Sequence, residues 1–162
     1  MALTQVSAEV LNNSQGNITT VGTLIEPSFS GNITLGGRST FSKGISETIA
    51  GTKNSSTGNV IHDFSTGSIW IHNSVSSNFT VDLTNVPTTN DRTYSIALIL
   101  DQAGTAYIPS GFKINGSTQT IQWADNSEPS GNAGAWDVVS FTLIRTSDLW
   151  IVFGVLNTFG TS

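Results

Sequence analysis

Residues that could do chemistry gather in one stretch, "QTIQWADNSEPSGNAGAWDVVSFTLI", at positions 119–144. Trp123 and Trp136 stand on either side of a loop of turn-forming residues. The carboxylates in or beside this loop are Asp125, Glu128 and Asp137. One interpretation is a sugar-binding or catalytic loop, because aromatic faces hold sugar rings and paired carboxyl groups hydrolyse glycosidic bonds. The other is a long hairpin loop whose two tryptophans cover its base.

Catalysis is the weaker of the two functions that this loop could have. Glycoside hydrolysis needs two carboxyl groups about 5 to 9.5 Å apart on rigid elements, one of them in a cavity that raises its pKa. The three acids stand at turn positions, where carboxylates commonly cap or solvate loops. The sequence also lacks a Gly-x-Ser-x-Gly elbow for a nucleophile. We therefore expect no enzyme and no catalytic residues, and we take Trp123, Asp125, Asn126 and Trp136 as candidate glycan-binding residues.

The two histidines of the chain, His62 and His72, are the only candidates for a metal site. Asp63 could orient an imidazole, but adjacent residues of a strand point to opposite faces. No zinc-binding spacing such as His-Glu-x-x-His is present. The histidines fall on neighbouring predicted strands joined by the turn "STGS", so their rings are placed to meet and hydrogen-bond. We expect a structural role, with no metal ion and no cofactor.

The composition excludes several kinds of partner. Of the 162 residues 37% are hydrophobic and only 10% charged, so Ser, Thr, Asn and Gly must supply most of the polar surface. The net charge is −5 and the six Lys and Arg residues are scattered, which argues against nucleic acid as a partner. Without cysteine there is neither a disulfide nor a thiolate ligand. No apolar run approaches the roughly 20 residues of a membrane helix, so we expect no membrane insertion.

Short alternating segments predict strands throughout residues 45–162. In "NFTVDLTNV" the side chains of Phe79, Val81 and Leu83 share one face, and "RTYSIALIL" at 92–100 alternates in the same way. No sustained helical period of apolar residues is present. We expect an all-β domain at 45–162, an antiparallel β-sandwich of the jelly-roll type.

The last predicted strand is apolar on both faces. It follows the preceding strand through "RTSD", a turn typical of a hairpin. A strand with one solvated face would alternate polar and apolar residues, so this strand lies either at the centre of the fold or against another subunit. The candidate interface residues are Trp150, Ile151, Val152, Phe153 and Val155.

Residues 1–44 differ from the rest of the chain. They contain "GNITTVGTL" and "GNITLGGRS", two copies of Gly-Asn-Ile-Thr fifteen residues apart, with sparse apolar residues and many glycines. Such a segment buries too little apolar area to become ordered alone. We expect an extended attachment arm that lies on a sister subunit or on another partner; the alternative is that it packs back on its own domain.

Five segments carry a resemblance to a known family. They are "GNVIHDFSTGSIWIHNS", "NFTVDLTNVPTTNDRTYSIALIL", "AYIPSGFKINGSTQTIQWADN", "PSGNAGAWDVVSFTLIRT" and "LWIVFGVLNTFG". In this order they resemble a domain of structural and fibre-like proteins of marine bacteriophages, especially those that infect cyanobacteria. The family's recurrent elements match His62, Asp63, His72, Asn78 to Thr80 and Val86 to Thr89. The resemblance implies a β-rich, trimeric virion domain, often at the end of a fibre-type polypeptide, and no catalytic residues.

These observations lead to one expected function and one alternative. We expect a virion structural protein on the outer surface of a capsid or tail, a capsid-decorating (cement) or tail-attached homotrimer. Its arm would attach to capsid or tail proteins by adding strands to their free sheet edges. The alternative is a tail-fibre-type receptor-binding domain that recognises host surface polysaccharide through Trp123, Trp136 and nearby polar side chains.

Overall fold

The structure, a computed structural model, describes residues 37, 39–42 and 44–160. The chain divides into two compact units, residues 1–43 and 44–162. The expected attachment arm at residues 1–44 lies almost entirely outside the described residues. The fold described below is therefore that of the second unit.

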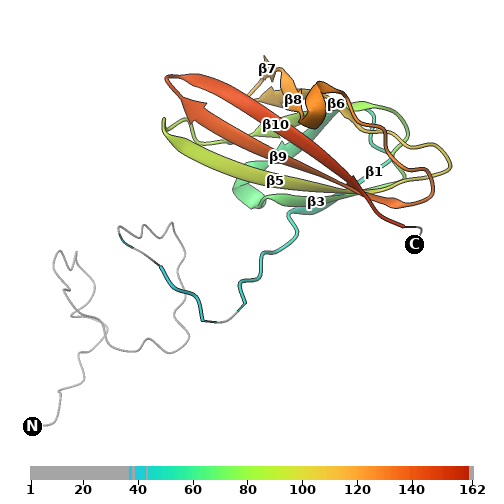
Figure 1. Ribbon diagram of the computed structural model, residues 1–162, viewed down its shortest axis with the longest axis horizontal. Helices are drawn as coiled ribbons and strands as arrows, with labels where there is room; N and C mark the ends of the chain where they lie inside the picture. Colours follow the sequence, from blue (N-terminus) through green and yellow to red (C-terminus); the bar gives the residue numbers. More distant parts are fainter. Residues whose placement is uncertain (1–36, 38, 43, 161–162) are drawn as a thin grey trace, which may run out of the picture. The chain divides into compact units, whose positions relative to one another are not determined.

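The described part of the second unit is built almost wholly from strands (Figure 1). The strands are β1 (Gly51–Asn54), β2 (Gly58–Asp63), β3 (Ile69–Asn73), β4 (Phe79–Thr84), β5 (Arg92–Asp101), β6 (Pro109–Ile114), β7 (Ser117–Gln119), β8 (Ile121–Trp123), β9 (Trp136–Thr146) and β10 (Leu149–Thr158). Two short 3₁₀ turns, η1 (Phe64–Thr66) and η2 (Ala124–Asn126), interrupt them. In this part of the chain no helix is long and apolar enough to cross a membrane.

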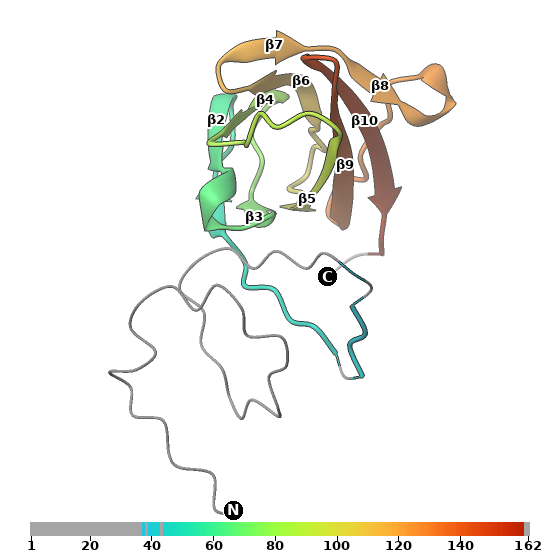
Figure 2. The ribbon, with the colours of Figure 1, turned by 90° about the vertical axis from the view of Figure 1, so that its left-hand side faces the viewer.

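The strands form two sheets that enclose one core. The six-stranded sheet has the order β1-β3-β5-β9-β10-β8, and the four-stranded sheet has the order β2-β4-β6-β7. From β1 to β6 the chain alternates between the sheets, so each strand lies beside the strand two places earlier in the sequence. Figure 2 shows the two sets of strands on opposite sides of the common interior. The first six strands therefore make three successive windings of the chain.

The all-β character agrees with the sequence prediction, but the expected antiparallel pairing is wrong. Both sheets are mixed. The parallel pairs are β1–β3, β3–β5, β8–β10, β2–β4 and β4–β6. Only β5–β9, β9–β10 and β6–β7 are antiparallel among the described pairs. Side chains alternate with period two in either kind of strand, so the sequence pattern did not reveal the direction of pairing.

Inward-facing residues of both sheets fill the core. Phe79, Val81 and Leu83 of β4 are 1%, 0% and 0% exposed, which confirms the alternation predicted for this strand. The rings of Phe112 in β6 and Phe141 in β9 meet with centroids 4.8 Å apart, one from each sheet. Aromatic pairs of this geometry contribute beyond their buried area, so this contact helps to hold the two sheets together.

A tight hairpin joins β9 and β10, as "RTSD" predicted. Ser147 and Asp148 have φ angles of 49° and 61°, the left-handed values that a two-residue hairpin turn favours. The amide of Asp148 donates to the side-chain oxygen of Asn90, 3.0 Å away. From this turn the two strands pair over ten residues, from Leu149 opposite Thr146 to Thr158 opposite Asp137.

Candidate functional site

The loop between β8 and β9 is not a hairpin loop. Strand β8 pairs in parallel with β10, with Ile121 opposite Val152 and Trp123 opposite Gly154. Strand β10 therefore lies between β8 and β9. The interpretation of the loop as a hairpin with tryptophans at its base is wrong, because its two flanking strands are not neighbours.

The structure does not bring Trp123 and Trp136 into one site. The ring of Trp123 packs inward, with its centroid 5.8 Å from that of Phe141 in the core. Trp136 precedes the fully buried Asp137, so the alternation of β9 turns Trp136 to the outer side of the sheet. Trp123 lies opposite Gly154 of β10, which lies opposite Phe141 of β9. Phe141 is five residues from Trp136, so the two tryptophans are separated by roughly 17 Å along the strand direction.

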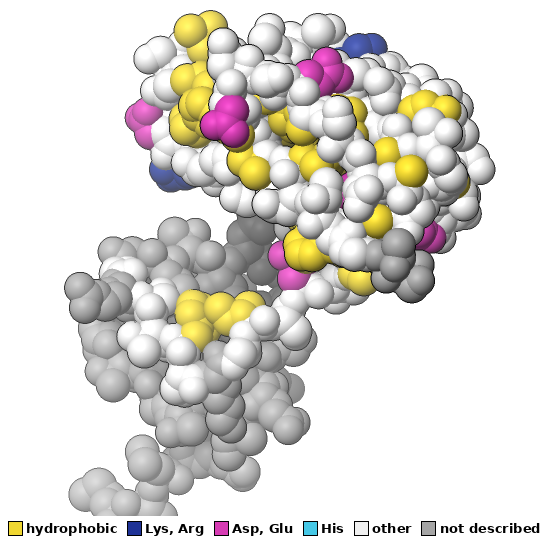
Figure 3. Space-filling view, turned by 45° about the vertical axis from the view of Figure 1, so that its right-hand side comes forward, with side chains coloured by type: hydrophobic (Ala, Val, Ile, Leu, Met, Phe, Trp, Pro, Cys, Tyr) yellow, Lys and Arg dark blue, Asp and Glu magenta, His cyan; other side chains and the backbone are white. Residues whose placement is uncertain are grey.

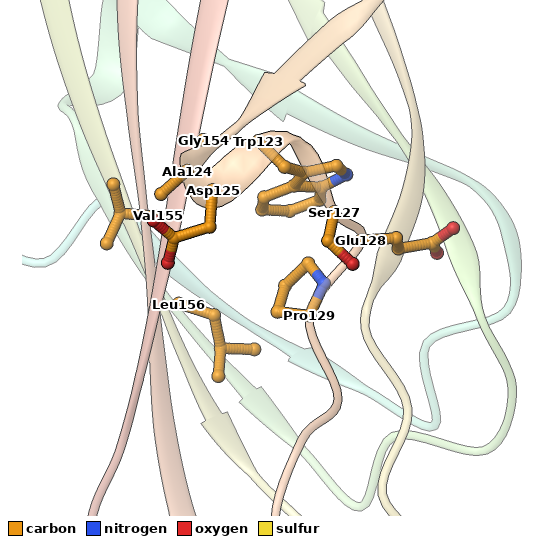
Figure 4. A pocket seen from close by; sticks show the side chains of 9 residues that line it. All are labelled: Trp123, Ala124, Asp125, Ser127, Glu128, Pro129, Gly154, Val155 and Leu156. Carbon is orange, nitrogen blue, oxygen red and sulfur yellow. The ribbon is translucent and has the colours of Figure 1, made fainter.

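Trp123 instead contributes to a pocket of about 300 Å³ beside β10 (Figure 4). The pocket is lined by Trp123, Ala124, Asp125, Ser127, Glu128, Pro129, Gly154, Val155 and Leu156. Figure 4 shows the carboxylates of Asp125 and Glu128 on opposite sides of the indole of Trp123. An aromatic face with polar groups around it can hold a sugar by stacking and hydrogen bonding. The candidate residue Asn126 lies in the 3₁₀ turn η2, as Asp125 does, but Asn126 does not line the pocket.

Gly154 makes room for the ring of Trp123. A Cβ atom at position 154 would lie 2.7 Å from two ring carbons of Trp123 and 2.9 Å from Ile121. Real Cβ atoms do not approach so closely, so any side chain here would displace the indole or β8. The pocket wall therefore depends on a glycine in the middle of a long strand.

Asp137 is a structural carboxylate. It is fully buried, and its Oδ2 accepts hydrogen bonds from Gln102 Nε2 at 3.0 Å and from the amide of Asn132 at 2.9 Å. Gln102 in turn bonds the carbonyl of Tyr107, so these contacts tie two loops to the start of β9. Because Asp137 does not line the pocket, the three loop carboxylates do not form a catalytic set.

The histidines meet in the core. The Nε2 atoms of His62 and His72 are 3.0 Å apart, and His72 Nδ1 is 2.7 Å from Ser56 Oγ. Both rings are 0% exposed, and His72 stacks on Phe79 at 5.0 Å. The strands β2 and β3 belong to different sheets. The two histidines therefore meet across the core, not across a pair of hydrogen-bonded strands.

Burial keeps both rings neutral. It lowers the pKa of His62 from 6.5 to about 3, assisted by the nearby His72 and Lys53 and opposed by the backbone of Val60. Burial and Lys53 lower the pKa of His72 to about 4. A charged imidazole would lose its hydration here without gaining an acidic partner.

The histidine pair lacks the further ligands of a metal site. Among the described residues no three His, Asp or Glu side chains come together. Asp63 points to the other face of β2 from His62 and accepts from Asn85 Nδ2 and from the amide of Ser65, each at 2.9 Å. Those bonds lower the pKa of the Asp63 carboxyl, with the Asn85 side chain as the largest cause. The geometry agrees with structural hydrogen bonding.

The candidate interface residues of β10 divide between the two sides of its sheet. Ile151, Phe153 and Val155 point outward and are 37%, 45% and 43% exposed. Val152 is 0% exposed and belongs to the core, so its place among the interface candidates was wrong. Trp150 is half-buried and points inward.

The contacts of Trp150 are with its own chain. Its ring centroid is 5.8 Å from that of Tyr94, and the guanidinium of Arg145 lies 5.3 Å from the ring. The sequence pattern, apolar on both faces of the strand, did not show which residues faced inward.

Outward-pointing apolar side chains also occur on the neighbouring strands of the six-stranded sheet. We use the name outer face for the outward-pointing side chains of β3, β5, β9 and β10. The strand register places Ile71, Ile99 and Val138 in one row and Ile144 beside Ile151 in another. Sequence reasoning missed these residues, because the outward positions of β5 and β9 are mixed: Ile99, Val138 and Ile144 alternate with polar residues such as Ser95, Ser140 and Thr142.

The outer face carries no Lys or Arg among the described residues. Lys53, Arg92 and Arg145 alternate to the inner side of their strands, and Lys113 belongs to the four-stranded sheet. The outward positions of β4 are instead polar: Thr80, Asp82 and Thr84. Figure 3 shows hydrophobic side chains on the surface of the domain with few charged ones among them. The outward side of β4 is thus polar, whereas that of β10 is apolar from Leu149 to Val155.

Comparisons with family models, with curated proteins and with solved structures find no match to this chain.

Proposed function

We propose that this protein is a non-enzymatic building block that assembles with copies of itself through the outer face. The observation that carries the proposal is the row of exposed apolar side chains along β10, Leu149, Ile151, Phe153 and Val155, 37% to 68% exposed. Rows of exposed apolar side chains on folded proteins commonly mark interaction sites. Burying these side chains against a second copy would contribute about 25 cal/mol per Å² of apolar surface.

The larger assembly in this proposal is a virion. The protein would be a homotrimeric β-sandwich that decorates a capsid or attaches to a tail, with residues 1–30 of its arm bound to the particle surface. The low charge of the chain supports this, because contacts made by amide, hydroxyl and apolar groups depend little on salt. The choice of a virion starts from the resemblance of five sequence segments to structural phage proteins, which was the expectation from the sequence.

One substitution tests self-association. Phe153→Lys places a charge in the middle of the outer face and should reduce the oligomeric mass, measured by light scattering, to that of one chain. The matched control is Thr118→Lys, at an exposed position of β7 in the four-stranded sheet, which should leave the mass unchanged. A wild-type protein that is a single chain at all concentrations would refute the proposal.

Deletion tests the attachment. Removing residues 1–30 should leave a folded oligomer, by circular dichroism and light scattering, that no longer binds purified particles. Unchanged occupancy on the particle would show that the arm is not the anchor.

A receptor-binding domain is the second candidate function, and the pocket at Trp123 favours it. The half-exposed indole with Asp125 and Ser127 near it can hold a sugar of a host surface polysaccharide. Trp123→Ala should abolish any binding on a glycan array, whereas Trp136→Ala, which does not alter the pocket, should retain it. Absence of binding to polysaccharide or lipopolysaccharide at millimolar sugar would exclude this candidate.

A further inference from the structure

The first two strands, β1 and β2, lie at the same end of the two sheets in strand order. Strands β1 and β2 each lie at the edge of their sheet, so each has one side without a neighbouring strand in the described part of the chain. Strand β1 has four residues and carries Lys53, and short edge strands with a lysine resist further pairing. Strand β2 is longer and uncharged up to Asp63, and its Ile61 is 59% exposed. The free edge of β2 can therefore accept another strand.

A groove lies beside the edge strands β1 and β2. Residues 52–57 and 59–61, from both edge strands and the turn between them, line a space of about 410 Å³. Val60 points toward the core but is only partly buried, and among the described residues no strand covers its other side. An added strand would satisfy the free backbone groups of β2 and complete the burial of Val60.

The chain carries a second copy of the pattern that begins β4. There Phe79 and Val81 are buried, Thr80 points outward, and the side chain of Asn78 accepts from the amide of Ile108 in the following winding at 3.1 Å. The same order, Asn, apolar, Thr, apolar, occurs at positions 32–35 as Asn32, Ile33, Thr34 and Leu35. The earlier copy at 17–20 has Thr20 in the last position, which would place a hydroxyl in the core. Positions 31–36 therefore fit a strand of the four-stranded sheet better.

We propose that residues 31–36 of a second copy of this chain pair in parallel with β2 as a fifth strand of its four-stranded sheet. This rests on the proposed self-association and names the segment that links the copies. Since Gly58 is opposite Phe79, and Val60 opposite Val81, the shared pattern places Ile33 opposite Gly58 and Leu35 opposite Val60. Position 58 has nothing within 4 Å of where a Cβ would lie, which leaves room for Ile33.

The connection is long enough for this segment to reach a second copy. Within the windings, five residues (64–68) connect β2 to β3 and seven (85–91) connect β4 to β5. Fourteen residues (37–50) separate position 36 from β1, and 44–49 are exposed, with Ile45 at 74%. Fourteen extended residues span up to about 50 Å, enough to reach a neighbouring molecule.

Because the chain has no cysteine, two single variants test this contact directly. The proposed register places Thr34 opposite Asn59, with both side chains on the outer side of the sheet. Thr34→Cys protein mixed with Asn59→Cys protein should give a covalent dimer under mild oxidation or with a short bismaleimide. The control mixture, Thr34→Cys with Thr118→Cys on the other edge strand of the same sheet, should give at least tenfold less dimer.

Each result decides the question. Equal yields in the two mixtures, or no dimer in a wild-type-like oligomer, overturn the strand pairing while self-association through the outer face stands. A Thr34→Cys/Asn59→Cys double variant that forms only an intrachain link shows that the segment belongs to the same chain, and it overturns the inference. If light scattering of the wild type finds a single chain and no dimer forms, both the inference and the proposed function are wrong.

Discussion

The Nε2 atoms of His62 and His72 lie 3.0 Å apart, one from each sheet, and no charged group bonds either ring. One ring must donate and the other accept, so the accepting imidazole must be neutral, and burial lowers the pKa of both rings. Ser56, in the turn between β1 and β2, bonds the far side of His72. The pair thus links the first two windings through their interior.

Acid should destabilise the protein through this pair. The unfolded chain binds a proton on each histidine near pH 6.5, whereas the folded pKa values are about 4 for His72 and about 3 for His62. The unfolded state therefore binds more protons below pH 6.5, and the free energy of unfolding should fall as the pH decreases from 6.5 toward 3. We expect a loss on the order of 3 to 5 kcal/mol between pH 6.5 and 4, measured by urea unfolding.

The double variant His62→Leu/His72→Leu is the control for the acid effect. It removes both titrating groups, so its unfolding free energy should change much less over the same pH range. Imidazole resonances of the wild type that titrate near pH 6.5 would contradict the neutral pair, and two histidines make the assignment simple.

Gly154→Ala should disturb the pocket and the edge of the six-stranded sheet. The new methyl group would lie 2.7 Å from the ring of Trp123, so the indole and β8 must move outward. We expect a loss of about 1 to 3 kcal/mol and a red shift of tryptophan fluorescence. Gly104→Ala is the control: nothing lies within 4 Å of its Cβ position, and its unfolding free energy should change by less than about 0.5 kcal/mol.

Asp137→Asn should loosen the loops at the start of β9. The amide oxygen can take the place of Oδ2 and still accept from Gln102 and Asn132, but these bonds lose the charge of the carboxylate, and the NH₂ group takes the buried Oδ1 position, which has no partner. We expect a loss of about 1 to 3 kcal/mol and faster proteolysis between residues 124 and 135. Asp125→Asn is exposed and should have no effect on either measurement; equal effects of the two variants would exclude the anchoring role of Asp137.

Local pattern predicted the strands and their faces well. The alternation in 78–86 and 92–100 identified the core residues of β4 and β5, and "RTSD" identified the β9–β10 hairpin. His62 and His72 meet, as expected, but across the core between the two sheets and not across a strand pair. The strand faces and the hairpin depend on neighbours a few residues apart, for which side-chain period and turn chemistry carry the information.

The candidate site was less predictable. Trp123 and Trp136 flank one loop in the sequence, yet one faces the core and the other faces outward. Their separation follows from the insertion of β10 between β8 and β9, a pairing of residues about 30 positions apart. The turn-forming residues beside β8 and β9 do not indicate which distant strand will pair with β8.

By itself the sequence determined that the chain forms strands, which side chains of β4 and β5 are buried, and that β10 is apolar on both faces. Only the tertiary structure decided that the chain alternates between two sheets, that the pairs are mostly parallel, and that Val152 is core while Phe153 is surface. The physical reason is that burial alternates along a strand whatever its neighbour, whereas the choice of neighbour depends on the packing of both sheets around one core.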